Sequence, residues 1–488
     1  MTAFGGIFLL WFIKTAGCDV VYTDYIRIVA EYLPDVTDPS KFLVPDILTR
    51  IPATFLQRLI NVKLFSYSVT FDRLCAAAGL WGCALVIAFY MRKERLSALW
   101  FVPIAAVIFS LNKWEIILNG TAWAHVAAFA LFFLNYYLLD RYYGRQRPEG
   151  GNFASGLGAR LHDGGGNAGS NTVSGEESRA LKSSLYVLPF IMLLFAGEYI
   201  ASYAAIMLAA YGFCFFMKKR SGDTAAEGIY LRGFLCTLAA IGLYLLSRHF
   251  AVWEHAGTTD MGIFEVIAED PLFIPRLFIK SFAGTVLGTE AINNFRGSGM
   301  PLSDNGVLLL GLLVIAAYIF AIVLYIRHRL WERTLFPMIL MLSGGFNHVL
   351  VTASRWIFLS ESYGLSSRYG AQFMIGVIGI LLTLALCIKD RDADGENRKM
   401  GFAKLTVSLL ITLMFLFGNC FTTYLEMGVA PYREENYTKL QQVVFNYRDY
   451  EPEELADCLE WGKSEETMYK ALEILEDNKL NVFSYMER

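Results

Sequence analysis

Basic residues recur in every second connection between the long apolar segments of this chain. They include the clusters at residues 92–95, 218–220 and 327–329. The other connections are longer and carry carboxylates, aromatic residues and single arginines. A bilayer core about 30 Å thick needs roughly 20 apolar residues in a helix, and loops rich in Lys and Arg stay on the cytoplasmic side. The alternation therefore predicts the membrane spans and their direction, with the polar chemistry on the outer side.

The composition excludes an ordinary soluble domain. Apolar residues make up 55% of the chain and charged residues 18%, with a mean hydropathy of +0.42. We therefore expect an all-α polytopic membrane protein with about eleven transmembrane helices, a cytoplasmic N-terminus and an external C-terminus. The expected spans are residues 3–20, 71–91, 96–111, 121–139, 185–196, 201–217, 231–246, 306–326, 335–352, 369–387 and 402–421.

This topology divides the chain into a transmembrane domain, residues 1–421, and a small external helical tail, residues 422–488. The first outer loop is residues 19–70 and the second is residues 248–304. Residues 148–180 are rich in Gly, Ser and Asn, which predicts a disordered cytoplasmic loop. Residues 1–4 lack a basic stretch, which favours a retained first span over a signal peptide.

The first outer loop contains the most candidate functional groups. Asp19, Asp24 and Arg27 follow the first span directly. Residues 42–64 then show an apolar helical face with Arg50, Arg58 and Lys63 on its cationic side, which predicts an interfacial helix on the outer leaflet. Charged groups at a membrane edge favour a functional interpretation. The simpler alternative is a connector whose acids cap helices.

Two further outer turns supply candidate binding residues. Trp114, Glu115 and Asn119 lie between the third and fourth spans, and Glu198 and Tyr199 form a tight hairpin. A carboxylate on such a hairpin must face water or a partner. The alternative for Trp114 is an aromatic belt residue at the bilayer interface.

The ninth and tenth spans contribute His348, Arg355, Arg368 and Tyr369 near their outer ends. A guanidinium group there can bind a phosphate in bidentate geometry or extend to lipid headgroups. A single histidine on an apolar face is more often a core residue than a catalyst.

The sequence lacks the motifs of several common classes of enzyme. The sequence has no P-loop, no H-E-x-x-H and no G-x-S-x-G, and its six histidines are scattered. The run Gly164-Gly165-Gly166-Asn167-Ala168-Gly169 has no strand before it, so we interpret it as composition. No metal site and no nucleic-acid partner is predicted; no cofactor is identified, and a divalent metal is left open.

The chain resembles the GT-C superfamily of integral membrane glycosyltransferases, and more closely a group of bacterial GT-C-like membrane proteins. The resemblance runs through Thr23-Asp24-Tyr25, residues 50–73, residues 114–120, Ser367-Arg368-Tyr369 and residues 478–483. It implies a catalytic carboxylate in the first outer loop, at Asp24 or Asp19. It also implies a sugar donor linked to a polyprenyl phosphate and a cell-envelope lipid or glycan acceptor, at the outer side of the bacterial cytoplasmic (inner) membrane.

In this interpretation Arg368, Arg355 and Arg27 bind the donor phosphate. Trp114, Glu115, Asn119, Glu198, Tyr199, His348 and Tyr369 then contact the substrates. Two alternatives stay open, a transporter or flippase of a lipid or glycan and a non-catalytic envelope-assembly protein. A transporter would more often place ionisable residues at the bilayer midplane.

The alternation of loops makes the topology testable. A reporter fused after Arg145 or Arg391 is expected to score as cytoplasmic, and one fused after Arg488 as external, because basic loops are retained inside. An internal C-terminus would show that one span has been miscounted.

Overall fold

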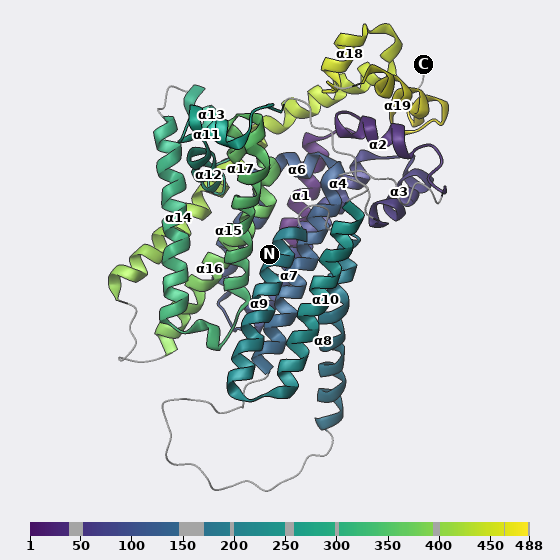
Figure 1. The fold of residues 1–488 in the computed structure, drawn as a ribbon. Helices are drawn as coiled ribbons and strands as arrows, with labels where there is room; N and C mark the ends of the chain where they lie inside the picture. The colour runs from purple at the N-terminus through teal and green to yellow at the C-terminus, as the bar shows by residue number, and fades with distance from the viewer. Residues whose placement is uncertain are drawn as a thin grey trace, which may run out of the picture.

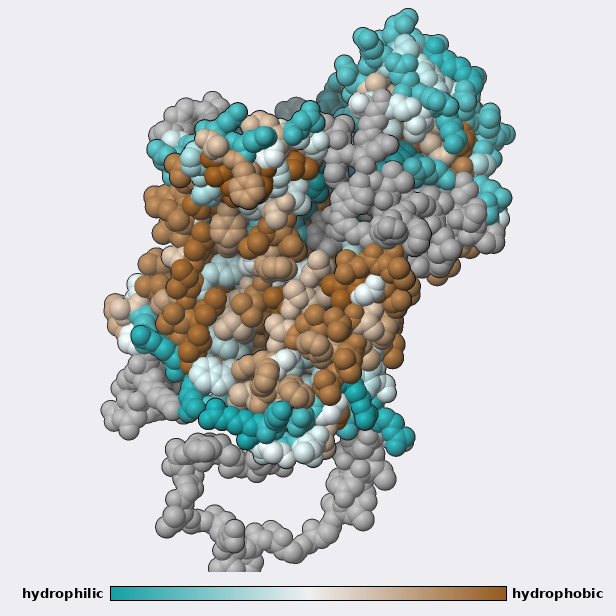
Figure 2. Space-filling model, in the orientation of Figure 1, coloured by the Kyte–Doolittle hydropathy of each residue, from teal (hydrophilic) through white to brown (hydrophobic). Residues whose placement is uncertain are grey.

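The computed structural model describes residues 1–38, 52–145, 170–195, 200–248, 258–297, 302–393, 401–462 and 464–486. These residues form helices, turns and irregular segments, with no strand among them. Long helices lie side by side in a bundle, and short helices gather at one of its edges (Figure 1). Apolar residues form a belt around the visible face of the bundle, with hydrophilic residues along the edges (Figure 2).

Nine helical runs in the described ranges are long and apolar enough to cross a bilayer. One is the broken run Ala98–Leu118, which contains α5 (Phe101–Phe109) and α6 (Trp114–Leu118). The others are α4 (Val69–Lys93), α7 (Trp123–Arg145), α9 (Ile200–Ser221), α10 (Thr224–Arg248), α14 (Asp304–Arg327), α15 (Phe336–Arg355), α16 (Gly370–Ala393) and α17 (Phe402–Phe445). The chain thus has the helices of an all-α multi-pass membrane protein.

Two further expected spans correspond to helices that do not meet the same criteria. The first is α1 (Thr2–Ala16), which is apolar but only 15 residues long. The second is α8 (Ser170–Leu193), which begins within the segment that was predicted to be disordered. Good helix formers such as Glu176, Glu177 and Ala180 extend the helix upstream of its apolar part. The count of eleven spans and the sidedness therefore stay predictions, and residues 148–169 lie outside the described part.

Close approach between backbones packs the centre of the bundle. A Cβ on Gly344 of α15 would lie 2.2 Å from the backbone nitrogen of Gly376 on α16, so only glycine fits there. A Cβ on Gly79 of α4 would likewise lie 2.7 Å from the Val126 backbone of α7. Small residues of this kind let apolar helices associate in a bilayer. Helix α16 is the central element, with 94% of its apolar window buried.

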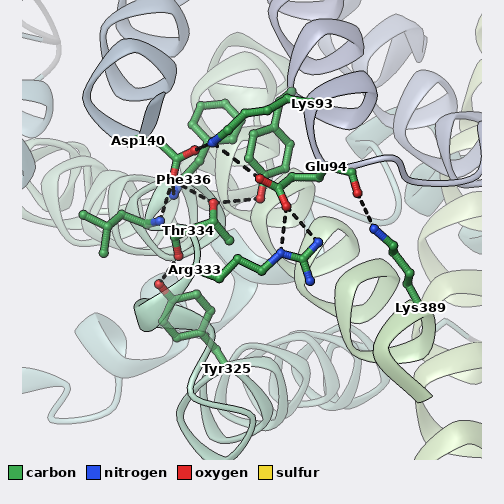
Figure 3. A network of polar contacts seen from close by, with 10 residues as sticks. Lys93, Glu94, Asp140, Tyr325, Arg333, Thr334, Phe336 and Lys389 are labelled. Atoms are coloured by element: carbon green, nitrogen blue, oxygen red, sulfur yellow. Dashed lines mark hydrogen bonds and ion pairs between the residues drawn. The ribbon is translucent and has the colours of Figure 1, made fainter. Parts of the chain in front are cut away.

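A buried carboxylate fixes the edge of the bundle that carries the basic clusters, which we call the basic edge. Asp140 of α7 is completely buried and accepts hydrogen bonds from the Thr334 hydroxyl (2.7 Å) and the Leu335 backbone N–H (2.6 Å). Its other oxygen pairs with Lys93 Nζ at 2.6 Å (Figure 3). Asp140 thereby supplies the cap that the start of α15 lacks in its own sequence.

Glu94 extends this network to the turn before α15 and to α16. Its carboxylate accepts hydrogen bonds from Nε and a terminal nitrogen of Arg333, both at 2.8 Å. Its backbone carbonyl accepts one from Lys389 Nζ at 2.6 Å (Figure 3). These contacts join the ends of α4, α7, α15 and α16, so much of the charge at this edge is structural.

The opposite edge carries a layer built from the two ends of the chain, which we call the outer layer. The first loop contributes α2 (Asp24–Tyr32) and α3 (Pro52–Phe65). The tail contributes α18 (Pro452–Cys458), α19 (Glu465–Asp477) and η11 (Asn481–Ser484) (Figure 1). Apolar residues of both segments share one core, in which Tyr25 and Val29 pack with Leu472 and Leu475.

The predicted tail does not begin at a break in the structure. Helix α17 runs for 44 residues from the bundle into the outer layer, so residue 422 lies in the middle of a helix. The tail is also no separate unit, because its apolar core is shared with the first loop. A segment of this size buries too little surface alone.

Helix α3 differs in orientation from the predicted interfacial helix. Four of its polar residues are buried, namely Thr54, Gln57, Arg58 and Asn61. The Arg58 guanidinium lies 3.7 Å from the centre of the Tyr32 ring, whereas Lys63 is exposed as predicted. Leu56 and Leu64 are exposed on the other face. Arg58 is therefore part of the interior, not of a cationic surface. Arg50 lies outside the described residues.

The second outer loop forms three short helices, α11 (Ile263–Glu269), α12 (Phe273–Ala283) and α13 (Thr289–Gly297). Glu361, in the turn after α15, pairs with Lys280 Nζ and Arg276 Nε of α12, both at 2.6 Å. These ion pairs fix the loop against the bundle.

Replacing Asp140 with Ala is expected to lower the free energy of unfolding by about 3–5 kcal/mol, because Lys93 loses its buried partner. Thermal unfolding of the purified protein in detergent measures this. The control is Glu332→Ala, which breaks an exposed pair with Arg329 and is expected to change stability by less than about 1 kcal/mol. Equal shifts in the two variants would contradict a structural role for the buried network.

Candidate functional site

A polar cavity of about 360 Å³ lies where the bundle meets the outer layer. Its walls come from the head of α2, from α6, from the start of the tenth expected span and from the second half of α17. The tail contributes Cys458 and Glu460 to the lining. Aromatic and charged side chains dominate it, namely Tyr22, Trp114, Tyr437, Glu115, Glu460, Arg368 and Arg433. Pockets that combine aromatic surfaces with a few fixed polar groups are typical ligand sites.

Arg368 and Glu115 form an ion pair on the cavity wall. Nε of Arg368 donates to the Glu115 carboxylate, which also accepts a hydrogen bond from the Ser367 hydroxyl at 3.1 Å. The pair uses only Nε, so the terminal nitrogens of Arg368 can serve a ligand. The structure thus brings together two predicted site residues that lie 253 positions apart.

Asp24 directly follows the cavity-lining residues Tyr22 and Thr23 in the chain. It begins α2, is half-buried, and its carboxylate interacts electrostatically with Arg368. The preceding Thr23 lines the cavity with φ +47°, a conformation that β-branched residues rarely adopt. The backbone N–H of Thr23 donates to the Leu459 carbonyl of the tail at 2.8 Å. Strain of this kind often accompanies functional sites.

Asp19 has a different position and role. Its Oδ1 accepts hydrogen bonds from the backbone N–H groups of Val69 (2.6 Å) and Thr70 (3.3 Å), at the start of α4. It also accepts one from the Asn481 amide at 3.3 Å. Asp19 therefore caps a helix and joins it to the tail. Of the two candidate bases, Asp19 is thus engaged in structural hydrogen bonds, and Asp24 is the one that interacts electrostatically with Arg368 on the cavity wall.

Arg433 is a cavity residue that sequence reasoning missed. Its guanidinium lies 3.7 Å from the centre of the Trp114 ring, and one terminal nitrogen pairs with the buried Glu426 carboxylate at 2.6 Å. Its other terminal nitrogen is buried without a hydrogen-bond partner among the described residues. Only the continuation of α17 past residue 421 carries Arg433 to the cavity, and the prediction ended that helix too early.

Two tyrosine hydroxyls meet on the cavity wall. Tyr22 and Tyr437 lie 3.0 Å apart, oxygen to oxygen. Burial raises the pKa of Tyr22 well above its usual value, and the neighbouring Tyr437 raises it further. The Tyr22 hydroxyl therefore stays neutral and can donate a hydrogen bond, but it is no base at ordinary pH.

An apolar groove of about 440 Å³ lies beside the cavity, between α1, α5 and α17. Thr423 and Met427 line it, and Arg433 and Tyr437 line the cavity farther along the same helix. At 1.5 Å per residue, Met427 and Arg433 are separated by about 9 Å along the axis. The groove and the cavity are therefore close neighbours along α17.

Of the other predicted ligands, Asn119 lines the cavity, whereas Arg355, Tyr369 and Arg27 are not part of its lining. Arg355 lies 5.6 Å from the centre of the Tyr369 ring, and Tyr369 itself is buried. Arg27 lies on α2.

His348 lies in the interior of the bundle. Its ring is stacked between Phe282 and Phe373, with centroid distances of 3.8 and 4.0 Å, and Nδ1 hydrogen-bonds the Ser281 hydroxyl at 2.8 Å. The structure thus places it as a core residue. Glu198 and Tyr199 lie outside the described residues.

Two adjacent charged residues beneath the outer layer were also missed. The Asp72 carboxylate is buried and accepts hydrogen bonds from Tyr25 (2.9 Å), Asn61 (2.9 Å) and Gln57. Arg73 is completely buried and donates to the carbonyls of Cys18 (2.7 Å) and Leu118 (2.6 Å). Both lie at the start of the second expected span, where charged residues commonly mark the end of an apolar run. The sequence pattern alone therefore did not indicate that they are buried.

No group of three or more His, Cys, Asp or Glu side chains suited to a metal ion occurs in the described ranges. No protein-family model matches the chain, and neither a curated protein nor a solved structure shows a significant match to it.

Proposed function

We propose that this protein is a membrane glycosyltransferase that moves a sugar from a polyprenyl-phosphate-linked donor to a cell-envelope lipid or glycan acceptor. The reaction takes place at the outer side of a bacterial cytoplasmic membrane. One observation carries the proposal: two arginines, two carboxylates and three aromatic rings line one polar cavity near an apolar groove, and Asp24 interacts electrostatically with one of the arginines, Arg368.

The groove and the cavity suit the two parts of such a donor. The polyprenyl chain occupies the apolar groove along α17, and the sugar phosphate enters the cavity. Arg368 and Arg433 provide positive charge there, and guanidinium groups bind phosphate through paired hydrogen bonds. Trp114 and the two tyrosines offer flat faces for a sugar ring. A donor held in this way needs no nucleotide-binding domain.

Asp24 acts as the general base in this proposal. It removes the proton from the acceptor hydroxyl, whose oxygen then forms a bond to the anomeric carbon of the donor. The bond between that carbon and the lipid phosphate breaks, and the phosphate leaves with the electron pair. The arginines stabilise the negative charge that develops on the phosphate. Attack opposite the leaving group inverts the anomeric configuration.

Replacing Asp24 with Asn is expected to reduce glycan transfer by roughly 10²–10⁴-fold, the usual effect of losing a general base. The unfolding temperature is expected to stay near that of the wild type, because the side chain keeps its size. Transfer from a synthetic polyprenyl-phosphate sugar by the purified protein in detergent or nanodiscs measures this.

The matched control is Asp449→Asn, an exposed carboxylate of the outer layer away from the cavity lining, which is expected to keep full activity. Asp19→Asn is instead expected to lower stability, because it weakens the α4 cap. Full turnover by Asp24→Asn would contradict the proposed mechanism. Transbilayer movement of the donor lipid without any transfer would support a transporter.

Replacing Arg368 with Lys tests donor binding. An ammonium keeps the charge but cannot maintain the contact with Glu115 and bind a phosphate through two nitrogens. We expect KM for the donor to rise roughly 10- to 100-fold with a smaller change in kcat. Arg355→Lys is the comparison, and a larger effect there would place the donor phosphate on the far side of Tyr369.

A further inference from the structure

A second apolar groove, of about 280 Å³, opens on the side of the bundle near the basic edge. Its walls come from α9, α14, α15 and the short turn that contains Trp331. Phe213, Ile326 and Leu342 form part of its lining and are 39–51% exposed, so the groove faces the surroundings of the bundle. This surface belongs to the apolar belt above the hydrophilic lower edge (Figure 2).

The lining of this groove extends over about two thirds of one leaflet. Ile206, Ala210 and Phe213 line it at helical spacing along α9. Phe213 is about 10 Å beyond Ile206 along the helix axis at 1.5 Å per residue. One leaflet contributes about 15 Å of hydrocarbon to the bilayer core. A second helix, about 10–12 Å across, cannot enter a space of this volume. The groove thus suits a single acyl chain.

Positive charge lies where the headgroup of such a lipid would be. Arg220 is exposed and lies two turns beyond Phe213, on the same face of α9. Arg329 is 64% exposed, and its guanidinium lies 5.9 Å from the centre of the Trp331 ring, which lines the groove.

Nearby acidic groups do not cancel this charge. Glu332 pairs with Arg329 at 2.8 Å, and Asp223 pairs with Lys218 at 3.5 Å. The pair of Arg329 is solvent-exposed and weak. Lys219, Arg220 and Arg327 add further exposed positive charge to the ends of α9 and α14.

From this juxtaposition we propose that the groove between α9, α14 and α15 binds an anionic phospholipid. One acyl chain lies along Ala210 and Phe213, and the phosphate-containing headgroup contacts Arg220 and Arg329. Basic pockets between membrane helices recognise anionic headgroups in this way. The site is separate from the cavity of the proposed function and does not depend on it.

Native mass spectrometry of the purified full-length protein in detergent tests the proposal, with phosphatidylglycerol and phosphatidylcholine of identical acyl chains as probes. We expect the wild type to retain phosphatidylglycerol preferentially. The double variant Arg220→Gln, Arg329→Gln is expected to weaken phosphatidylglycerol binding about 10- to 30-fold. The reason is that the two cationic groups make similar contributions to binding the anionic headgroup, and both are lost. Ala210→Trp, which fills the groove, is expected to abolish the binding of both lipids there.

The control is Ala106→Trp, which fills the other apolar groove and is expected to leave phosphatidylglycerol binding at this site unchanged. Equal affinity for the two lipids, or unchanged binding in the double arginine variant, would overturn the proposal. If Ala210→Trp does not fold, the double variant still decides, because both arginines are exposed and outside the core.

Discussion

The junction between the bundle and the outer layer depends on one buried cation. Arg73, in the first turns of α4, donates to the carbonyl at the end of α1 and to the carbonyl at the end of α6. Its guanidinium also lies 5.4 Å from the centre of the Tyr437 ring in α17. A Cβ on Gly17 would lie 2.6 Å from this guanidinium, so glycine is needed there. Burying a charge is costly unless it is hydrogen-bonded, and the bonds from Nε and Nη1 of Arg73 to two carbonyls fix these elements relative to one another.

Charged side chains have different roles at the two edges of the bundle. At the basic edge, Asp140 and Glu94 are buried and their partners are helix ends, so the network stabilises the fold. At the opposite edge, Arg368 and Arg433 are each held by one carboxylate and still border an open cavity. A cation with remaining donors beside a cavity can meet a ligand, whereas a fully paired one cannot.

The cavity depends on the shared core of the outer layer. Leu472 and Leu475 of the tail pack with the apolar face of α2, and the Leu459 carbonyl accepts the hydrogen bond that fixes Thr23. This packing places Asp24 beside Arg368. The tail is therefore part of the site, although its helical pattern alone predicted only a small appendage.

The sequence was sufficient to predict the helical membrane class, most of the span positions and several cavity residues, including Trp114, Glu115 and Arg368. These follow from local patterns, because a bilayer requires continuous apolar runs and leaves polar groups at their ends. Only the tertiary structure separated the capping Asp19 from Asp24 and brought Arg433 to Trp114. It also buried His348 between two aromatic rings. Such contacts join residues far apart in the chain. A local hydrophobic pattern predicts a helix and its buried face, but not which other helix that face contacts.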